Sequence, residues 1–397
     1  MKYFKIGLLL RVVIAIILGI LLGLIFPDWL SRVFLTFNAF FGNFLNFVVP
    51  LIILGLIAPG IADLGKNAGR LLLITSGVAY AFTIFTGLFA YLSGLVFLPG
   101  LIGGDGTSMV SEATKILQPY FTLEMLPVFD VMTALILSFM LGIGISFAQG
   151  TVLKRGFDEF KDIIMLIINK VVIPLLPLYI FGIFMSMTVS GQVAGVLSVF
   201  IKIVVLIFVL TAILLVVQFI FAGLIAKANP FKSLRTMMTA YLTALGTQSS
   251  AATIPVTYQQ ALKLGIDKDI AGFVIPLCAT IHLSGSMLKI TVCAMAVMMM
   301  NGQPIDPEIF IGFIFVLGVS MVAAPGVPGG AIMAAVGVLT SVLGFSEESI
   351  GLMIALYIGM DSFGTAANVT GDGAISLIID RIYKKKAVPE EALPDLN

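Results

Sequence analysis

Charged residues are scarce in this chain of 397 residues, where they make up 11% against 59% hydrophobic residues. Soluble globular domains contain about 25% charged residues, so the composition excludes that class and indicates a protein of the lipid bilayer. A net charge of +1 offers no basic face of the kind that binds nucleic acid. We therefore expect no nucleic-acid partner.

Cysteine and histidine are nearly absent. Cys278 and Cys293 lie in one apolar segment, where a helical path separates them by about 22 Å. A disulfide needs Cα atoms within about 7 Å, so the two cannot bridge, and neither redox chemistry nor a cysteine metal site is expected. The single histidine, His282, and nearby Ser284 point to different sides of a helix. A membrane-embedded serine hydrolase is thus unsupported, and we expect no enzyme and no cofactor.

Long apolar segments recur through the N-terminal part. Each segment after the first is long enough to supply the ~20 residues that span a bilayer. No small-residue cleavage site follows the first segment, which we therefore interpret as an uncleaved membrane helix. The segments predict six helices, at residues 12–26, 38–60, 71–98, 127–150, 162–190 and 194–226.

Basic residues mark alternate connections between these segments. Under the positive-inside rule this predicts a multi-pass protein of the cell inner (cytoplasmic) membrane with both termini in the cytoplasm. The residues concerned are Lys2, Lys5, Arg11, Lys66, Arg70, Lys154, Arg155, Lys161, Lys227, Lys232, Arg235 and Lys384 to Lys386.

Two polar or proline-broken stretches, residues 247–255 and 323–330, interrupt the apolar C-terminal part. Non-helical backbone is tolerated at membrane depth only beside protein or a water-filled cavity, and paired interruptions indicate a transporter's binding site. Lys263 and Lys268 place the end of the first interruption inside, whereas acidic residues flank the second. We therefore expect two re-entrant hairpins of opposite topology, which is typical of an inverted repeat.

The expected architecture is an all-α polytopic membrane protein with eight transmembrane helices and two re-entrant helical hairpins. Residues 1–230 hold the six N-terminal helices, residues 231–385 a transport core, and residues 386–397 a cytoplasmic tail.

The last apolar segment carries a polar stripe. Asp361, Thr365, Asn368 and Asp372 follow the spacing i, i+4, i+7 and i+11, which places them within about 60° of each other on a helix. Intramembrane carboxylates are rare and usually functional. Two carboxylates with an amide between them suit an ammonium group and a hard cation.

A similar hydroxyl-glycine pattern occurs in the preceding segment. The run His282-Leu283-Ser284-Gly285-Ser286 echoes Asn368-Val369-Thr370-Gly371-Asp372, and glycine beside hydroxyl side chains predicts local unwinding at both places.

Lys289 and His282 each leave alternatives open. Lys289 lies too far from either end of a membrane span to snorkel, so it should have a partner or a role. It either pairs with an acidic residue such as Asp361 or Asp372, or supplies positive charge for an anionic substrate or a cation site. His282 is either a satisfied interior side chain or a proton relay, because imidazole changes charge near neutral pH.

Three separated motifs resemble the dicarboxylate/amino acid:cation symporter family, the glutamate transporter homologues. They begin at Gln248, Pro325 and Asp361, and read QSSAATIPVT, PGVPGGAIM and DSFGTAANVTGD. The last is similar to the neutral amino acid (serine/threonine) branch. The resemblance implies a homotrimer in which a static scaffold of early helices holds a mobile unit. That unit, made of the third and sixth helices, the hairpins and the last two helices, would move as an elevator.

The same resemblance implies the roles of individual residues. Asp361 would bind a substrate ammonium and Asn368 its α-carboxylate. The other substrate-site residues implied are Ser249, Ser250, Ser286, Gly326, Val327, Pro328, Gly329, Gly364 and Thr365. Asn368 and Asp372 would hold one sodium ion. Tyr80 and Thr83 correspond to a further cation site, at which His282 and Ser284 replace the family's asparagine and aspartate.

Substrate charge depends on what stands at two positions. Acidic amino acid carriers of the family have arginine at the position of Gly364, and some also at that of Gln248. Without a guanidinium a buried side-chain carboxylate is costly, so we expect a small neutral amino acid such as serine, threonine or alanine, coupled to sodium. The alternatives are a dicarboxylate or acidic amino acid held by Lys289, proton coupling through His282, and a passive channel.

Overall fold

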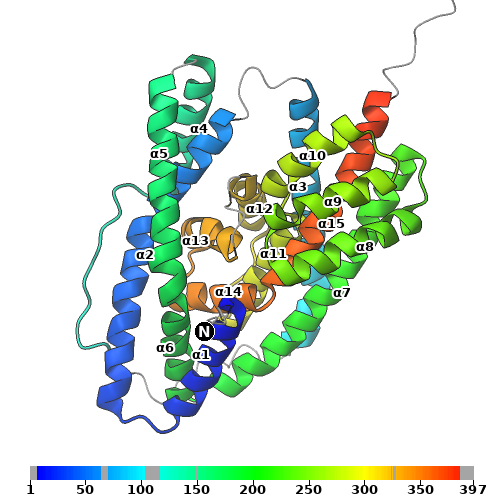
Figure 1. The fold of residues 1–397 in the computed structure, drawn as a ribbon. Coiled ribbons are helices and arrows are strands. Elements are labelled where there is room, and N and C mark those ends of the chain that lie inside the picture. The colour runs from blue at the N-terminus through cyan, green and yellow to red at the C-terminus, as the bar shows by residue number, and fades with distance from the viewer. Residues whose placement is uncertain are drawn as a thin grey trace, which may run out of the picture.

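A computed structural model of the protein describes residues 7–63, 70–102, 117–148, 151–322, 324 and 328–384 (Figure 1). All regular elements in these ranges are helices, which confirms the expected all-α class. The expected cytoplasmic tail, residues 386–397, lies outside the described residues.

The N-terminal part follows the six apolar segments. Its elements are α1 (Leu8–Gly23), α2 (Asp28–Asp63), α3 (Arg70–Ile102), α4 (Val131–Ala148), α5 (Thr151–Ile167), the π-helical η2 (Ile168–Val172), α6 (Ile173–Val189) and α7 (Val193–Ala226). The fifth expected segment is the continuous run α5–η2–α6. Pro174 and Pro177 explain the wider turn there, because each lacks an N–H and clashes with the carbonyl one turn earlier.

The C-terminal part repeats one pattern twice: two helices packed against each other, then a broken helix. The first copy comprises α8 (Pro230–Thr247), α9 (Ser250–Lys263), α10 (Lys268–Ile281) and α11 (Ser284–Met300). The second comprises α12 (Pro307–Val322), α13 (Gly330–Leu343), α14 (Glu347–Gly359) and α15 (Asp361–Lys384). The second expected interruption, residues 323–330, falls between α12 and α13. The first is shorter than expected, because only residues 248–249 separate α8 from α9, and Ser250 to Pro255 belong to α9.

Several helices are long and apolar enough to cross a membrane. Five such spans occur in the described residues, and the pair α14–α15, bent by 62°, is a sixth if it crosses as one. The shorter apolar helices include α1 and part of α4. The expected count of eight requires both of these to cross as well, and it stays a prediction.

The helices fall into two packing groups (Figure 1). One contains α1, α2, α4, α5 and α6, of which α1 packs on α6 and α4 on α2. The other contains α8 to α15 together with α3 and α7, which pack on α11 and α15. Contacts between the groups include those of α13 with α2 and of α14 with α1 and α6. The domain boundary at residue 230 stays a prediction.

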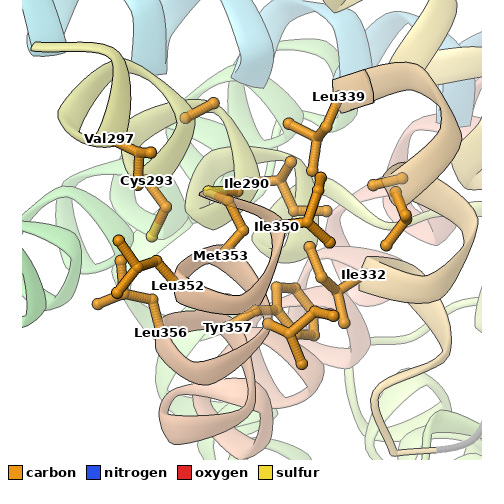
Figure 2. Close-up of a cluster of buried hydrophobic side chains, with 14 of the residues drawn as sticks. Ile290, Cys293, Val297, Ile332, Leu339, Ile350, Leu352, Met353, Leu356 and Tyr357 are labelled. Atoms are coloured by element: carbon orange, nitrogen blue, oxygen red, sulfur yellow. The ribbon is translucent and has the colours of Figure 1, made fainter. Parts of the chain in front are cut away.

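The core between α11, α13 and α14 is hydrophobic (Figure 2). Four side chains in this core are at most 2% exposed: Ile290 and Cys293 of α11, Ile332 of α13 and Met353 of α14. The sequence around Ile332 and Met353 is apolar on every side of the helix, so it does not indicate which face is buried. Burial on all sides explains why α11 shows no polar face toward lipid. This packing fixes α11 beside the break between α14 and α15.

One expectation about helix breaks is wrong. The break before Ser284 exists, since α10 ends at Ile281 and α11 begins at Ser284. Its expected counterpart at Thr370-Gly371 lies inside the continuous helix α15, and the actual break falls at Met360. Gly371 has another purpose: a Cβ there would lie 2.6 Å from His282 Cε1. The glycine permits close packing and does not unwind the helix.

Replacing Gly19 by alanine should destabilise the contact between α1 and α6. A Cβ at Gly19 would lie 2.6 Å from the Phe181 carbonyl oxygen, and a backbone atom cannot move aside cheaply. Overpacking of this kind typically costs about 1–3 kcal/mol. We expect a lower thermal midpoint in detergent than for Gly77→Ala, a control glycine in α3 with nothing within 4 Å of its added Cβ. Equal midpoints for the two variants would contradict the close approach of the helices.

Candidate functional site

Asp361 opens α15 directly after the helix break. The residue is 8% exposed, and its Oδ2 accepts a hydrogen bond of 2.7 Å from the Gly329 amide. Gly329 precedes α13 with φ +76°, a conformation that favours glycine. The N-terminal end of a helix also favours a carboxylate. Among the described residues of the interruption at 323–330, Gly329 thus ties this segment to the polar stripe of α15 through a hydrogen bond from its backbone amide to the Asp361 side chain.

Lys289 of α11 is the nearest cation to this carboxylate. Its Nζ lies 3.6 Å from Asp361 Oδ1 and donates a 3.2 Å hydrogen bond to the Met360 carbonyl oxygen. The ammonium also lies 3.9 Å from the centroid of the Tyr357 ring, close enough for a cation–π interaction. The side chain is 1% exposed. The structure thus confirms that Lys289 pairs with an acidic residue, and that residue is Asp361.

Gly364 makes room for this lysine. A Cβ at Gly364 would overlap Lys289 Nζ and Cε. A side chain at position 364 would therefore require the end of the Lys289 side chain to shift. The ammonium reaches from α11 into the space where the resemblance puts an arginine of α15.

Asn368 lies about two turns beyond Asp361 along α15, where hydrogen bonds hold its side chain. Its Oδ1 accepts a 2.7 Å hydrogen bond from the Gly285 amide, and its Nδ2 lies 3.4 Å from Ser286 Oγ. Ser286 Oγ in turn lies 2.9 Å from the Tyr357 hydroxyl. These bonds connect the beginning of α11, the middle of α15 and the end of α14. Thr365 is different, because its hydroxyl donates to the Asp361 carbonyl within α15.

A second polar cluster surrounds Asp372. His282 Nδ1 lies 2.9 Å from Asp372 Oδ1, and both side chains are 1% exposed. An ionised carboxylate can only accept, so with Asp372 ionised the shared proton would lie on Nδ1. Gln218 of α7 donates from Nε2 to Ser284 Oγ at 3.2 Å. Within the described part of the chain, His282 Nε2 and Gln218 Oε1 have no hydrogen-bond partner.

The remaining expected site residues are placed as follows. Ser249 caps α9 by accepting from the Ala252 amide, and Ser250 is buried behind it. The Thr83 hydroxyl donates to the Ala79 carbonyl, and the Tyr80 hydroxyl to the Phe315 carbonyl of α12. Pro328 directly precedes Gly329, whereas Gly326 and Val327 lie outside the described residues.

The sequence predictions missed Tyr357 and Gln218. Gln218 carried a signal, because an amide in the very apolar segment α7 is costly unless it finds partners. Tyr357 carried none, since an aromatic residue in an apolar segment is unremarkable until the break after it is known. A cavity of about 420 Å³ between α2, α6 and the start of α14 also went unforeseen. None of the expected site residues lines it.

Two pairs of packed helices, each followed by a broken helix, with the buried carboxylates of Asp361 and Asp372 on the second broken helix, are the arrangement typical of a secondary membrane transporter. The chain belongs to the sodium:dicarboxylate symporter family, whose model matches residues 8–382. It is similar to the serine/threonine transporter SstT of Acinetobacter baumannii, strains AYE and AB307-0294. Each is 27% identical to it over 392 residues, covering 95% of this chain and 97% of the relative. The protein is thus a membrane-embedded symporter and not an enzyme.

The pair Lys289–Asp361 should show strong energetic coupling. Removing one partner of a buried ion pair leaves an uncompensated charge, which typically costs about 3–5 kcal/mol. Lys289→Met and Asp361→Asn should therefore each lower the thermal stability, and the double variant should lose less than the sum of the two. The double-mutant cycle is measured by thermal unfolding in detergent. Additive losses would show that the two side chains do not interact.

Proposed function

We propose that this protein is a sodium-coupled symporter of small neutral amino acids, with serine, threonine and alanine as first substrates. It works in the cytoplasmic membrane as a homotrimer with both termini in the cytoplasm. Its hairpins, α8–α9 and α12–α13, are re-entrant, and together with the broken helices they move as an elevator against a scaffold of early helices. The printed name of its relatives, serine/threonine transporter, agrees with this substrate class.

The observation that carries this proposal is the buried carboxylate of Asp361 at the hairpin tip. A substrate ammonium is its natural partner, because a buried carboxylate is costly unless it is paired and hydrogen-bonded. Asp361 also accepts from the Gly329 amide, so an ammonium bound here would lie beside the tip of α12–α13. Asn368, two turns further along α15, offers its amide to the α-carboxylate of the substrate.

Neutral side chains are favoured because no guanidinium points into the site. Position 364 is glycine, and Gln248 ends α8 at the other hairpin tip in the left-handed conformation, with φ 53°. The charge of Lys289 is already opposed by Asp361 at 3.6 Å. A second carboxylate on the substrate would therefore have to compete with Asp361 for the charge of Lys289.

Sodium is proposed to bind at Asp372 and Asn368, whose carboxylate and amide oxygens are hard ligands. Asp372 Oδ1 contacts His282 Nδ1 at 2.9 Å, and Asn368 Oδ1 accepts from Gly285. A sodium ion must therefore use the other carboxylate oxygen or displace His282. At the further cation site near Tyr80 and Thr83, Ser284 stands where the resemblance implies an aspartate, and its hydroxyl accepts from Gln218. Coupling to protons through His282 remains the alternative.

A thermal-shift screen of the purified protein tests substrate and ion together. Serine or threonine should raise the thermal midpoint, and sodium should increase that shift, because a ligand stabilises the state that it binds. Asp372→Asn should remove the sodium-dependent part. Asp306→Asn is the matched control, since this exposed carboxylate only caps α12. Unchanged sodium dependence in Asp372→Asn would contradict the assignment.

A dicarboxylate or acidic amino acid is the second candidate, favoured by the position of Lys289 Nζ in the space beside Gly364. In that case succinate or aspartate, and not serine, stabilises the parent protein. The same screen decides between the two substrate classes.

A moving unit, and not a passive channel, should give ligand-dependent crosslinks. Cysteine pairs between Leu45 to Leu56 of α2 and the hairpin α8–α9, in a background lacking Cys278 and Cys293, should react differently with and without serine and sodium. Uptake into liposomes should exceed the equilibrium level only with an inward sodium gradient. Crosslinking that ignores every ligand, with uptake that stops at equilibrium, would favour a channel.

A further inference from the structure

We propose that Lys289 is a tethered stand-in for the substrate's ammonium group. In the empty protein its Nζ neutralises Asp361, and an incoming amine has to displace it. The inference rests on the proposed amino acid substrate. It adds a role for Lys289 in setting the affinity for that substrate and in allowing the carrier without substrate to return across the membrane.

In the structure the chain itself supplies partners to both oxygens of Asp361. Oδ2 accepts from the Gly329 amide at 2.7 Å, and Oδ1 faces Lys289 Nζ at 3.6 Å. With an amino acid bound, Asp361 would have the same two kinds of partner, the Gly329 backbone amide and an ammonium group, which would then belong to the substrate. The subsite for an amine is therefore filled before any substrate arrives.

Lys289 is placed to give way. The distance of 3.6 Å exceeds that of an N–H···O hydrogen bond, about 2.7–3.2 Å, so the attraction to Asp361 is mainly electrostatic. The hydrogen bond of Nζ goes to the Met360 carbonyl, and the Tyr357 ring lies 3.9 Å away. Both partners can still hold the ammonium after Asp361 has turned to a substrate. The lysine thus loses one of its three interactions and not all of them.

Two ammonium groups cannot share one carboxylate equally, because they repel each other in a buried site. The substrate therefore binds only to the fraction of molecules in which Lys289 has moved away. This lowers the apparent affinity by that same fraction. Removing the lysine's charge should raise the affinity for an amine-bearing substrate.

The tether also bears on the empty carrier. An unpaired buried Asp361 would be strongly unfavourable, so a carrier that has released its substrate needs another cation at this place. Lys289 is such a cation, and the bond from Gly329 to Asp361 forms beside it with no substrate present. The empty unit can therefore close and return without a second bound ion. Exchange of substrate for substrate does not need this step.

The experiment compares the parent, Lys289→Met and Lys202→Met in proteoliposomes. Lys202 is the matched control, because it is an exposed lysine of α7 that bonds to the Leu101 carbonyl. For Lys289→Met we expect at least tenfold tighter serine binding, serine exchange retained, and net sodium-driven uptake reduced at least tenfold. Lys202→Met should match the parent in all three. Unchanged binding, or exchange and net uptake falling together, would overturn the proposal.

Two further outcomes separate this proposal from the proposed function. If the parent binds succinate and not serine, and Lys289→Met loses that binding, then the lysine receives a substrate carboxylate and both ideas fail. If serine binds the parent but Lys289→Met binds it no better, only the tether fails. Should Lys289→Met not fold, a structure of the parent with serine decides. We expect Nζ beyond 3.6 Å from Asp361 there, and an unchanged pair would overturn the tether.

Discussion

The buried carboxylate of Asp361 organises this site, because it joins α15 to two segments that are distant in the chain, the start of α13 and α11. Asp361 stands at the break between α14 and α15, where it receives the Gly329 amide from one hairpin and faces Lys289 from α11. In the interior of a bilayer such a charge is rare, and it persists only if its partners are fixed in place. The helix break places the Asp361 carboxylate, and the Gly329 amide and Lys289 together stabilise its charge in the apolar interior.

Small residues then decide how closely these groups can meet. A Cβ at Gly285 would lie 2.5 Å from the Gly364 carbonyl oxygen, so α11 and α15 approach with their backbones almost in contact. Gly364 leaves space for the ammonium of Lys289, and Gly371 for the ring of His282. A larger residue at Gly285 would force the backbones of α11 and α15 apart, and one at Gly364 or Gly371 would displace Lys289 or His282. The three glycines are therefore as much a part of the site as the residues that carry charge.

Much of this arrangement could be predicted from local patterns. Proline and serine runs in apolar sequence predicted both interruptions, and helical spacing predicted that Asp361, Asn368 and Asp372 share a face. The pairing of Lys289 could be narrowed to two carboxylates, because a buried lysine needs one. Which carboxylate it takes depends on where α14 ends, and no residue type at Met360 announces that break. The false break at Thr370-Gly371 arose for the same reason, since glycine in a helix can mean either unwinding or close packing.

The two carboxylates of α15 have a further property in common. Asp361 faces Lys289 and Asp372 faces His282, so each basic partner comes from the broken helix of the first copy of the repeat and each acid from that of the second. The two copies are thus joined at two levels, one near each end of the polar stripe. Separating α10–α11 from α15 would leave two buried carboxylates and two buried basic groups without these partners, which is strongly unfavourable in a buried site. The two copies of the repeat are therefore held together where their broken helices meet.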